Sequence, residues 1–446
     1  MFAKLKISLP LLALPLLFGA ALSLHADFFA LDPGVRGDPA GAGGPIDGIS
    51  ANEMKFFEAG LAAFNEVQDV QGDDPGLGPR FNLDNCAGCH AQPAVGGSSP
   101  FTNPQVAVAA KANAKNVVPP FIKIDGPVRE ARFKFKANGT RDGGVHALFT
   151  ITGRDDAPGC FLDQPDFATA AAQNNLIFRI PTPTFGAGLI QAIDEDTILA
   201  NKRSRALRKQ FFGIAGRENR NGNDGTITRF GWKAQNKSLL IFAGEAYNVE
   251  QGVTNELFPQ ERDETPECHF NGTPEDQTRF DQTELTAVPS DTAKFAIFMR
   301  FLAPPIPTAE TPSISNGRSL FDRIGCALCH TPSLTTGKSS SAAFDQKPVN
   351  LYSDLLLHNM GPGLADDILQ GNARGDEFRT APLWGLGQRK FFLHDGRTTE
   401  LREAIIAHRS FGNLQFGPSE ANLAIQIFDS LGGADTQDIF NFLRSL

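Results

Sequence analysis

Apolar residues recur at intervals of three and four positions in several stretches of the chain, a spacing typical of amphipathic helices. These stretches are residues 53–67, 194–211, 236–249, 317–324, 400–408 and 439–446. Residues 128–153 differ, because apolar and polar positions alternate there on either side of the turn signals Asn138-Gly139 and Asp142-Gly143, as expected for a β-hairpin. The pattern predicts a mainly α fold with a β-containing insertion, at about residues 128–190, in the N-terminal region.

The first 26 residues have the composition of a secretory signal peptide. Two lysines precede a largely apolar stretch over residues 7–24, and a small residue, Ala26, follows it. A membrane anchor is the alternative, although two prolines interrupt the stretch. No later stretch reaches the ~18 apolar residues of a membrane-spanning helix. We therefore expect a periplasmic or secreted protein that is not an integral membrane protein.

A proline-rich segment at residues 303–307, Ala-Pro-Pro-Ile-Pro, is the clearest candidate linker in the chain. It predicts an N-terminal domain over residues 27–302, which contains the insertion, and a C-terminal domain over residues 303–446. A length of 446 residues agrees with more than one domain. The formal net charge is −9, and this acidic balance argues against a nucleic-acid partner.

Four of the six cysteines lie in two copies of a C-x-x-C-H motif. The first copy is Cys86-Ala-Gly-Cys89-His90, and the second is Cys326-Ala-Leu-Cys329-His330. This is the attachment motif of c-type haem, in which two thiols add to the vinyl groups of one haem and the adjacent histidine binds the iron. We therefore predict two covalently bound c-type haems, each in its own cytochrome c-like domain, with His90 and His330 as proximal ligands.

The remaining cysteines are Cys160 and Cys268. In an oxidising compartment the simplest arrangement is a disulfide between them. Two separate buried thiols are the alternative. The Cα–Cα distance between the two cysteines distinguishes these arrangements, and the sequence does not give that distance.

Histidine and methionine, the residues that can provide a second iron ligand, are unevenly distributed. Neither occurs between His90 and His146. The C-terminal domain, in contrast, contains three further histidines and one methionine. These residues are His358, Met360, His394 and His408. A haem used only for electron transfer normally has two axial ligands, whereas catalysis needs an open position. The asymmetry predicts an open first haem and a closed second haem.

The sequence resembles the bacterial di-haem oxidoreductases of the thiol oxidoreductase and peroxidase type, which belong to the superfamily of di-haem cytochrome c peroxidases. The matching stretches are residues 86–100, 231–234, 353–366, 378–385 and 392–397. In that superfamily the first haem reacts with peroxide and the second receives electrons from an external donor. The resemblance implies that His408, fourteen residues after His394, is the distal ligand of the second haem. Related peroxidases usually have Met there, and a bis-His iron generally has a lower potential than a His/Met iron.

The resemblance also implies a distal acid that moves protons during O–O cleavage. The candidates are Glu250, which we prefer, and Glu245, both within residues 244–251. A solvated helix face is the alternative interpretation of these acids. The superfamily further places a calcium ion between the haems, and its candidate ligands here are Asn103, Thr380 and Pro382.

The function predicted from these features is that of an extracytoplasmic di-haem oxidoreductase. It would reduce hydrogen peroxide at the first haem with electrons relayed through the second. A small cytochrome c or a cupredoxin would be the electron donor. One alternative is oxidation of an organic substrate, or its oxygenation with dioxygen, at the same haem. The other is an electron-transfer cytochrome without catalytic activity.

Overall fold

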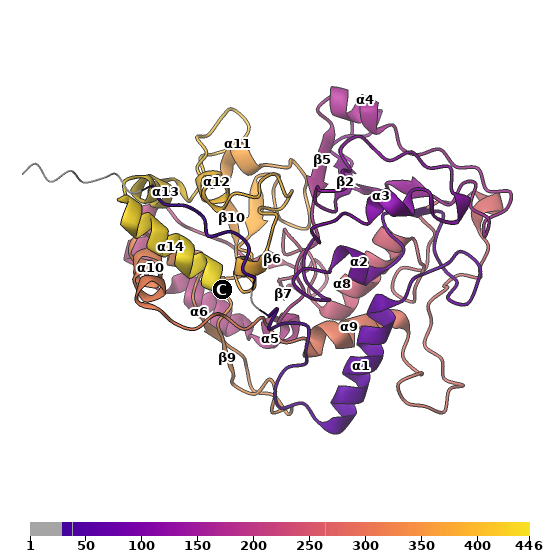
Figure 1. Ribbon diagram of the computed structural model, residues 1–446, viewed down its shortest axis with the longest axis horizontal. Helices are drawn as coiled ribbons and strands as arrows, with labels where there is room; N and C mark the ends of the chain where they lie inside the picture. Colours follow the sequence, from indigo (N-terminus) through magenta and orange to yellow (C-terminus); the bar gives the residue numbers. More distant parts are fainter. Residues whose placement is uncertain (1–28, 38, 264) are drawn as a thin grey trace, which may run out of the picture.

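The computed structural model describes residues 29–446 except positions 38 and 264 (Figure 1). The signal peptide predicted for residues 1–26 lies outside the described residues. Within the described part, no helix combines the length and the apolar character needed to cross a membrane.

The described chain contains helices and short strands in mixed order. The α-helices are α1 (Ala51–Asn65), α2 (Cys86–Cys89), α3 (Gln105–Val108), α4 (Phe167–Ala172), α5 (Ala187–Ala192), α6 (Glu195–Arg203), α7 (Ala206–Phe212), α8 (Leu239–Ala246), α9 (Asp291–Phe301), α10 (Pro312–Arg323), α11 (Gly361–Leu364), α12 (Leu401–Ile406), α13 (Asn422–Asp429) and α14 (Gly433–Ser445). Short 3₁₀ or π turns are η1 (Lys111–Asn113), η2 (Tyr247–Gln251), η3 (Pro266–Cys268), η4 (Cys326–Leu328) and η5 (Leu386–Gln388). The strands are β1 (Arg80–Phe81), β2 (Glu130–Phe133), β3 (Val145–His146), β4 (Phe149–Thr150), β5 (Leu176–Arg179), β6 (Asn219–Arg220), β7 (Ile227–Thr228), β8 (Leu334–Thr335), β9 (Pro348–Val349), β10 (Leu357–Asn359) and β11 (Glu377–Arg379).

Helix α1 packs against α9 in the half of the molecule that contains the first C-x-x-C-H motif (Figure 1). The helix begins at a capping box, in which the Ser50 hydroxyl accepts from the Glu53 amide and the Glu53 carboxylate accepts from the Ser50 amide. Gly60 permits the close approach of the two helices, because a Cβ atom there would lie 2.5 Å from the Lys294 carbonyl oxygen. Phe64 of α1 then contacts Phe298 of α9, with ring centroids 4.9 Å apart.

A similar crossing supports the second C-x-x-C-H motif, where α10 packs against α14. Gly317 of α10 allows this contact, because a Cβ atom at that position would lie 1.9 Å from the Asp438 carbonyl oxygen. Phe321 and Phe442 pack together beside it, with centroids 5.3 Å apart. Each haem-attachment motif thus follows a helix that is held by a glycine contact and an aromatic pair.

The strands form small antiparallel sheets. The largest has the order β3-β2-β5, and β2 pairs with β3 through Ala131↔His146 and Arg132↔Val145. The β-hairpin predicted for residues 128–153 is therefore confirmed. Cys160 and Cys268 form a disulfide with a Cα–Cα distance of 4.7 Å beside this region, which confirms the simpler of the two cysteine arrangements.

Other sequence-based predictions need refinement. The fold is a mixed helix and sheet structure, so mainly α describes it only in part. The helix predicted for residues 194–211 is two helices, because Arg205 adopts a left-handed conformation with φ 51° between α6 and α7. The candidate linker at residues 303–307 is hydrogen-bonded to residues 41–44. One core cluster includes residues from both sides of this linker, such as Phe298 and Phe344. The domain boundaries stay a prediction.

Candidate active site

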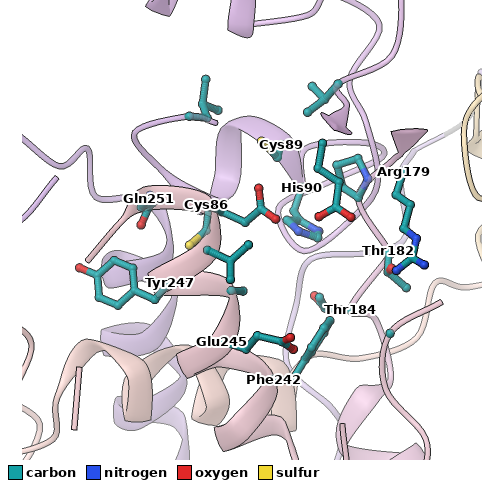
Figure 2. A pocket seen from close by; sticks show the side chains of 18 of the residues that line it. Cys86, Cys89, His90, Arg179, Thr182, Thr184, Phe242, Glu245, Tyr247 and Gln251 are labelled. Carbon is teal, nitrogen blue, oxygen red and sulfur yellow. The ribbon is translucent and has the colours of Figure 1, made fainter. Parts of the chain in front are cut away.

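The first C-x-x-C-H motif lies at one wall of a buried cavity (Figure 2). Asn85 caps the short helix α2, with its side-chain oxygen accepting from the Gly88 amide at 2.9 Å. This turn presents Cys86, Cys89 and His90 to the cavity. Phe242 and Glu245 of α8 and Tyr247 at the start of η2 also line this cavity (Figure 2).

The ring of His90 is oriented by its backbone surroundings. Its Nδ1 atom lies 3.0 Å from the Gly97 carbonyl oxygen, so Nδ1 donates and Nε2 keeps its lone pair. Burial lowers the pKa of His90 to about 4, which keeps the imidazole neutral. A neutral, oriented imidazole with a free Nε2 is the form of histidine that binds iron. Phe64 contacts the ring edge-on, with centroids 6.0 Å apart.

Glu250 lines the same cavity and belongs to a pair of partly buried carboxyl groups. Its Oε2 atom accepts from the side-chain amide of Asn82 at 2.9 Å, and its carboxyl group is hydrogen-bonded to that of Glu130. Burial and the neighbouring Glu130 raise the pKa of Glu250 well above its usual range. Glu130 is partly buried, which by itself raises its pKa, but Arg132 and Arg179 lower it below its usual value, and Arg132 Nε lies 2.6 Å from Glu130 Oε1. The pair therefore consists of a protonated Glu250 and an ionised Glu130.

Glu245, the second predicted acid, lines the cavity from α8 (Figure 2). Its carboxylate accepts a hydrogen bond from the side chain of Asn236. The structure thus brings both predicted acids to the cavity of the first motif. Glu130 lies on β2, far from the motif in sequence, and is not among the residues predicted for this site. Its position at the start of a predicted strand carried no signal of this role.

Buried arginines complete the lining of the first cavity. Among the described residues, the Nε atoms of Arg129 and Arg179 are buried without a hydrogen-bond partner, and both residues line the cavity. Cationic donors of this kind are suited to the propionate carboxylates of a haem. Two thiols, an oriented imidazole and these arginines are a donor set that fits a c-type haem.

The second C-x-x-C-H motif lines a separate, largely apolar cavity. His330 has the same orientation as His90, since its Nδ1 atom lies 3.0 Å from the Tyr352 carbonyl oxygen. Burial, with smaller contributions that include the nearby His408, lowers the pKa of His330 to about 4. Arg379 and Arg389 also line this cavity, and burial lowers the pKa of each to about 10. The donor set therefore fits a second haem.

Several possible distal ligands line the second cavity, and their hydrogen bonds distinguish them. His408 follows α12, and its Nδ1 atom lies 2.8 Å from the Ala404 carbonyl oxygen, which leaves Nε2 available. His358 uses both ring nitrogens, because Nε2 lies 3.0 Å from Asp354 Oδ2 and Nδ1 lies 2.8 Å from Glu420 Oε2. An imidazole held between two carboxylates has no lone pair for iron. The geometry therefore favours His408 over His358.

The buried group formed by Asp354, His358 and Glu420 was not recognised from the sequence. His358 is 3% exposed. Burial alone would lower its pKa, but its polar neighbours, among them the Asp354 carboxylate 3.0 Å away, raise the pKa of His358 well above its usual value. A charged imidazolium thus lies next to a haem-attachment cysteine.

Trp232 lines both cavities. Its indole Nε1 donates to the Ile180 carbonyl oxygen at 3.0 Å, which fixes the ring. Residues 231–234 are one of the stretches that resemble the di-haem oxidoreductases. The position of Trp232 between the two cavities, in contrast, follows only from the fold.

The predicted calcium ligands are engaged within the protein. Asn103 donates to the Pro127 carbonyl oxygen and accepts from the Gln105 amide. The carbonyl oxygen of Thr380 accepts from the Ser353 hydroxyl, and that of Pro382 lies 3.3 Å from a guanidinium nitrogen of Arg389. Calcium binding at these residues stays a prediction.

Two cavities, each with paired thiols and an oriented histidine, define a di-haem redox protein. A family model described as "Di-haem oxidoreductase, putative peroxidase" matches residues 146–446. The chain belongs to this family, and it is a di-haem oxidoreductase. No curated protein shows significant similarity to it.

Two solved structures show weak similarity to the chain. A MauG-like protein associated with microbial copper homeostasis is 18% identical over 37% of this chain and 55% of its own, with a TM-score of 0.26. The chain thus spans about half of that protein. The diheme peroxidase BthA from Burkholderia thailandensis is 14% identical over 94% of each chain, with a TM-score of 0.33. Similarities of this strength carry no argument about function.

Proposed function

We propose that the protein reduces hydrogen peroxide in the first cavity, with electrons that arrive through the second. In this proposal both haems are attached covalently, through Cys86 and Cys89 and through Cys326 and Cys329. The observation that carries the proposal is the carboxyl pair of Glu250 and Glu130 in the cavity of His90. The disulfide between Cys160 and Cys268 supports an extracytoplasmic location.

When bound, each haem supplies an iron that can accept and release single electrons. The overall reaction consumes one hydrogen peroxide, two protons and two electrons, and it yields two water molecules. The task of the polypeptide is to deliver the protons to the peroxide oxygens. Glu250 holds a proton at neutral pH because its pKa is raised by burial and by Glu130. It is therefore able to donate that proton to the departing oxygen as a general acid.

Glu130 holds Glu250 in its protonated form and remains ionised through its contact with Arg132. Asn82 fixes the Glu250 carboxyl group through a hydrogen bond of 2.9 Å. The peptide amide of Asn82 also donates to the Glu250 carbonyl oxygen at 2.7 Å, so both side chain and backbone are positioned. This arrangement pre-organises the proton donor before peroxide enters.

The second cavity supports a role in electron transfer. His330 and His408 lie near each other there, and each keeps Nε2 free by donating through Nδ1. Two such imidazoles would complete the coordination of one iron. Trp232, which lines both cavities, would lie on a short path for electrons between them.

Peroxide consumption tests the proposal directly. The purified, haem-loaded protein is mixed with hydrogen peroxide and a small reduced donor such as hydroquinone. We expect one hydrogen peroxide molecule to be consumed for every two electrons that the donor loses. Loss of the donor without loss of peroxide would contradict the proposal, and so would oxygen incorporation into an organic substrate as the main reaction.

A further inference from the structure

A surface next to the second C-x-x-C-H motif has the features of a docking site. It consists of the end of α6, helix α7 and the loop of residues 326–333, and we call it the α7 surface. Helix α7 is tied to the end of α10, because Arg208 Nη2 donates to the carbonyl oxygens of Asp322 and Arg323. That end of α10 lies immediately before Cys326.

The inner face of α7 contacts the haem-attachment segment itself. Phe212 packs in one cluster with Leu328, which lies between the two cysteines of the motif. The same ring lies so close to Gly325 that a Cβ atom there would be 2.4 Å from it. The exposed face of α7 is therefore separated from the second C-x-x-C-H motif by the helix itself and its inner side chains.

The outer face of α7 is apolar and exposed. Leu207 is 85% exposed and Phe211 is 72% exposed. Four positions separate them, so they share one face of the helix. The small hollow lined by Arg205, Lys209 and the loop lies on the opposite, inner side of the helix and is not part of this face. Exposed large apolar side chains on one face are a feature of protein interaction sites.

The rim of the α7 surface is basic, in a chain whose formal net charge is −9. Residues 202–209 read Lys-Arg-Ser-Arg-Ala-Leu-Arg-Lys and contain no acid. Arg203 at the end of α6 and Arg323 at the end of α10 are both exposed.

Part of this positive charge is balanced by ion pairs. Lys202 lies 2.7 Å from Glu218, and Asp322 serves both Arg205 and Arg208. Within the described residues, Arg203 and Arg323 form no ion pair, so their exposed charges are not balanced in this way.

We infer that the α7 surface binds an acidic electron-donor protein and that electrons enter the second haem there. The inference rests on the proposed function, because it needs a redox role for the second cavity. An apolar centre gives contact area, and a basic rim attracts an acidic partner and speeds its association at low ionic strength. Each encounter moves one electron, so that the donor is oxidised as the second site is reduced.

Two double variants alter the α7 surface and leave the predicted haem-binding residues unchanged. Arg203→Glu with Arg323→Glu reverses the charge of the rim, and Leu207→Ser with Phe211→Ser removes its apolar centre. The matched control is Lys123→Glu with Lys136→Glu, which reverses the same charge at exposed positions in the N-terminal part of the chain. Absorption spectra and unfolding temperatures check that every variant is folded and loaded.

The probe is plastocyanin, a small acidic copper protein, and the comparison is mitochondrial cytochrome c, which is basic. Calorimetry measures binding of oxidised plastocyanin to the oxidised haem-loaded protein at low ionic strength. Stopped-flow absorption measures haem reduction by reduced plastocyanin, without peroxide. For the unaltered protein we expect faster reduction by plastocyanin than by cytochrome c, and a rate that falls with added salt.

The charge reversal is expected to weaken binding and slow reduction by at least tenfold at low ionic strength, whereas the control stays within about twofold. The apolar variant is expected to weaken binding at every salt concentration. Equal effects of the control and the charge reversal would overturn the inference, and so would tighter binding of the basic cytochrome. Because no peroxide is present, a failure of peroxide turnover would contradict the proposed function and leave these results standing.

Discussion

Replacement of Glu250 by Gln separates proton donation from packing in the first cavity. Glutamine has the size of glutamate, and its carbonyl oxygen can still accept from Asn82. Its amide can also donate to the ionised Glu130, in place of the hydrogen bond that the two carboxyl groups share. The substitution therefore removes an acidic proton and leaves the surroundings of the side chain intact.

Loss of a positioned general acid typically slows a reaction by ~10²- to 10⁴-fold. Because a factor of ten corresponds to about 1.36 kcal/mol, the barrier should rise by roughly 2.7–5.4 kcal/mol. Stopped-flow absorption of the haem bands after mixing with hydrogen peroxide measures this step. The matched control is Glu245→Gln, which removes an acid from the same cavity, and we expect its rate to stay within about threefold of the original.

The pH dependence adds an independent check. Since the pKa of Glu250 is raised by burial and by Glu130, the active protonated form is present at neutral pH. The rate should fall as the pH rises through the pKa of Glu250. Glu130→Gln removes a neighbouring negative charge, so it should lower the pKa of Glu250 and move this fall to lower pH.

An unchanged peroxide reaction in Glu250→Gln would refute the assignment. A larger effect in Glu245→Gln would transfer the role of proton donor to Glu245. If the rate of the Glu130→Gln variant falls at the same pH as that of the original protein, the two carboxyl groups are not coupled.

Three further predictions concern the second cavity and the disulfide. His408→Met should raise the midpoint potential of the second haem and give a His/Met spectrum, and an unchanged low-spin spectrum in a redox titration would show that His408 is not a ligand. His358→Gln leaves two carboxylates without their shared cation, so chemical denaturation should show a loss of about 3–5 kcal/mol, and a neutral effect would contradict the charged state. Because the folded pKa of His358 is raised, its stabilisation is present at low pH and should disappear as pH rises through that pKa, a dependence that the Gln variant should lack. Cys160→Ala opens a disulfide whose cysteines are 108 positions apart and should lower stability by about 2–5 kcal/mol in the same assay, whereas an unchanged midpoint would mean that the bond does not form in solution.

The two-haem character could be predicted from the sequence because the signal is local. Two thiols and a histidine within five positions, such as Cys86 to His90, are typical of a c-type haem site, and covalent attachment at these cysteines stays a prediction. The hairpin at β2 and β3 was predictable for a similar reason, since alternation and turn residues act over short distances.

The partners of these residues depend on contacts between distant segments. Glu130 on β2 and Glu250 on η2 meet only because the fold packs these elements together, and neither residue carries a local signal of its partner. The charged state of His358 likewise requires Asp354 and Glu420, which approach it from both sides. The sequence predicted one helix over residues 194–211 because the apolar spacing continues through Arg205. The left-handed backbone of Arg205, which separates α6 from α7, leaves no trace in that spacing.

The central claim is that one iron is open to small molecules and the other is closed by two histidines. Electron paramagnetic resonance of the oxidised, haem-loaded protein tests it most directly, with the two signals integrated against the protein concentration. The account predicts one high-spin ferric signal per molecule from the cavity of His90. It also predicts one low-spin signal per molecule from the cavity of His330 and His408. Two low-spin ferric signals per molecule in the oxidised protein, with no change on addition of cyanide, would contradict this prediction and leave an electron-transfer cytochrome.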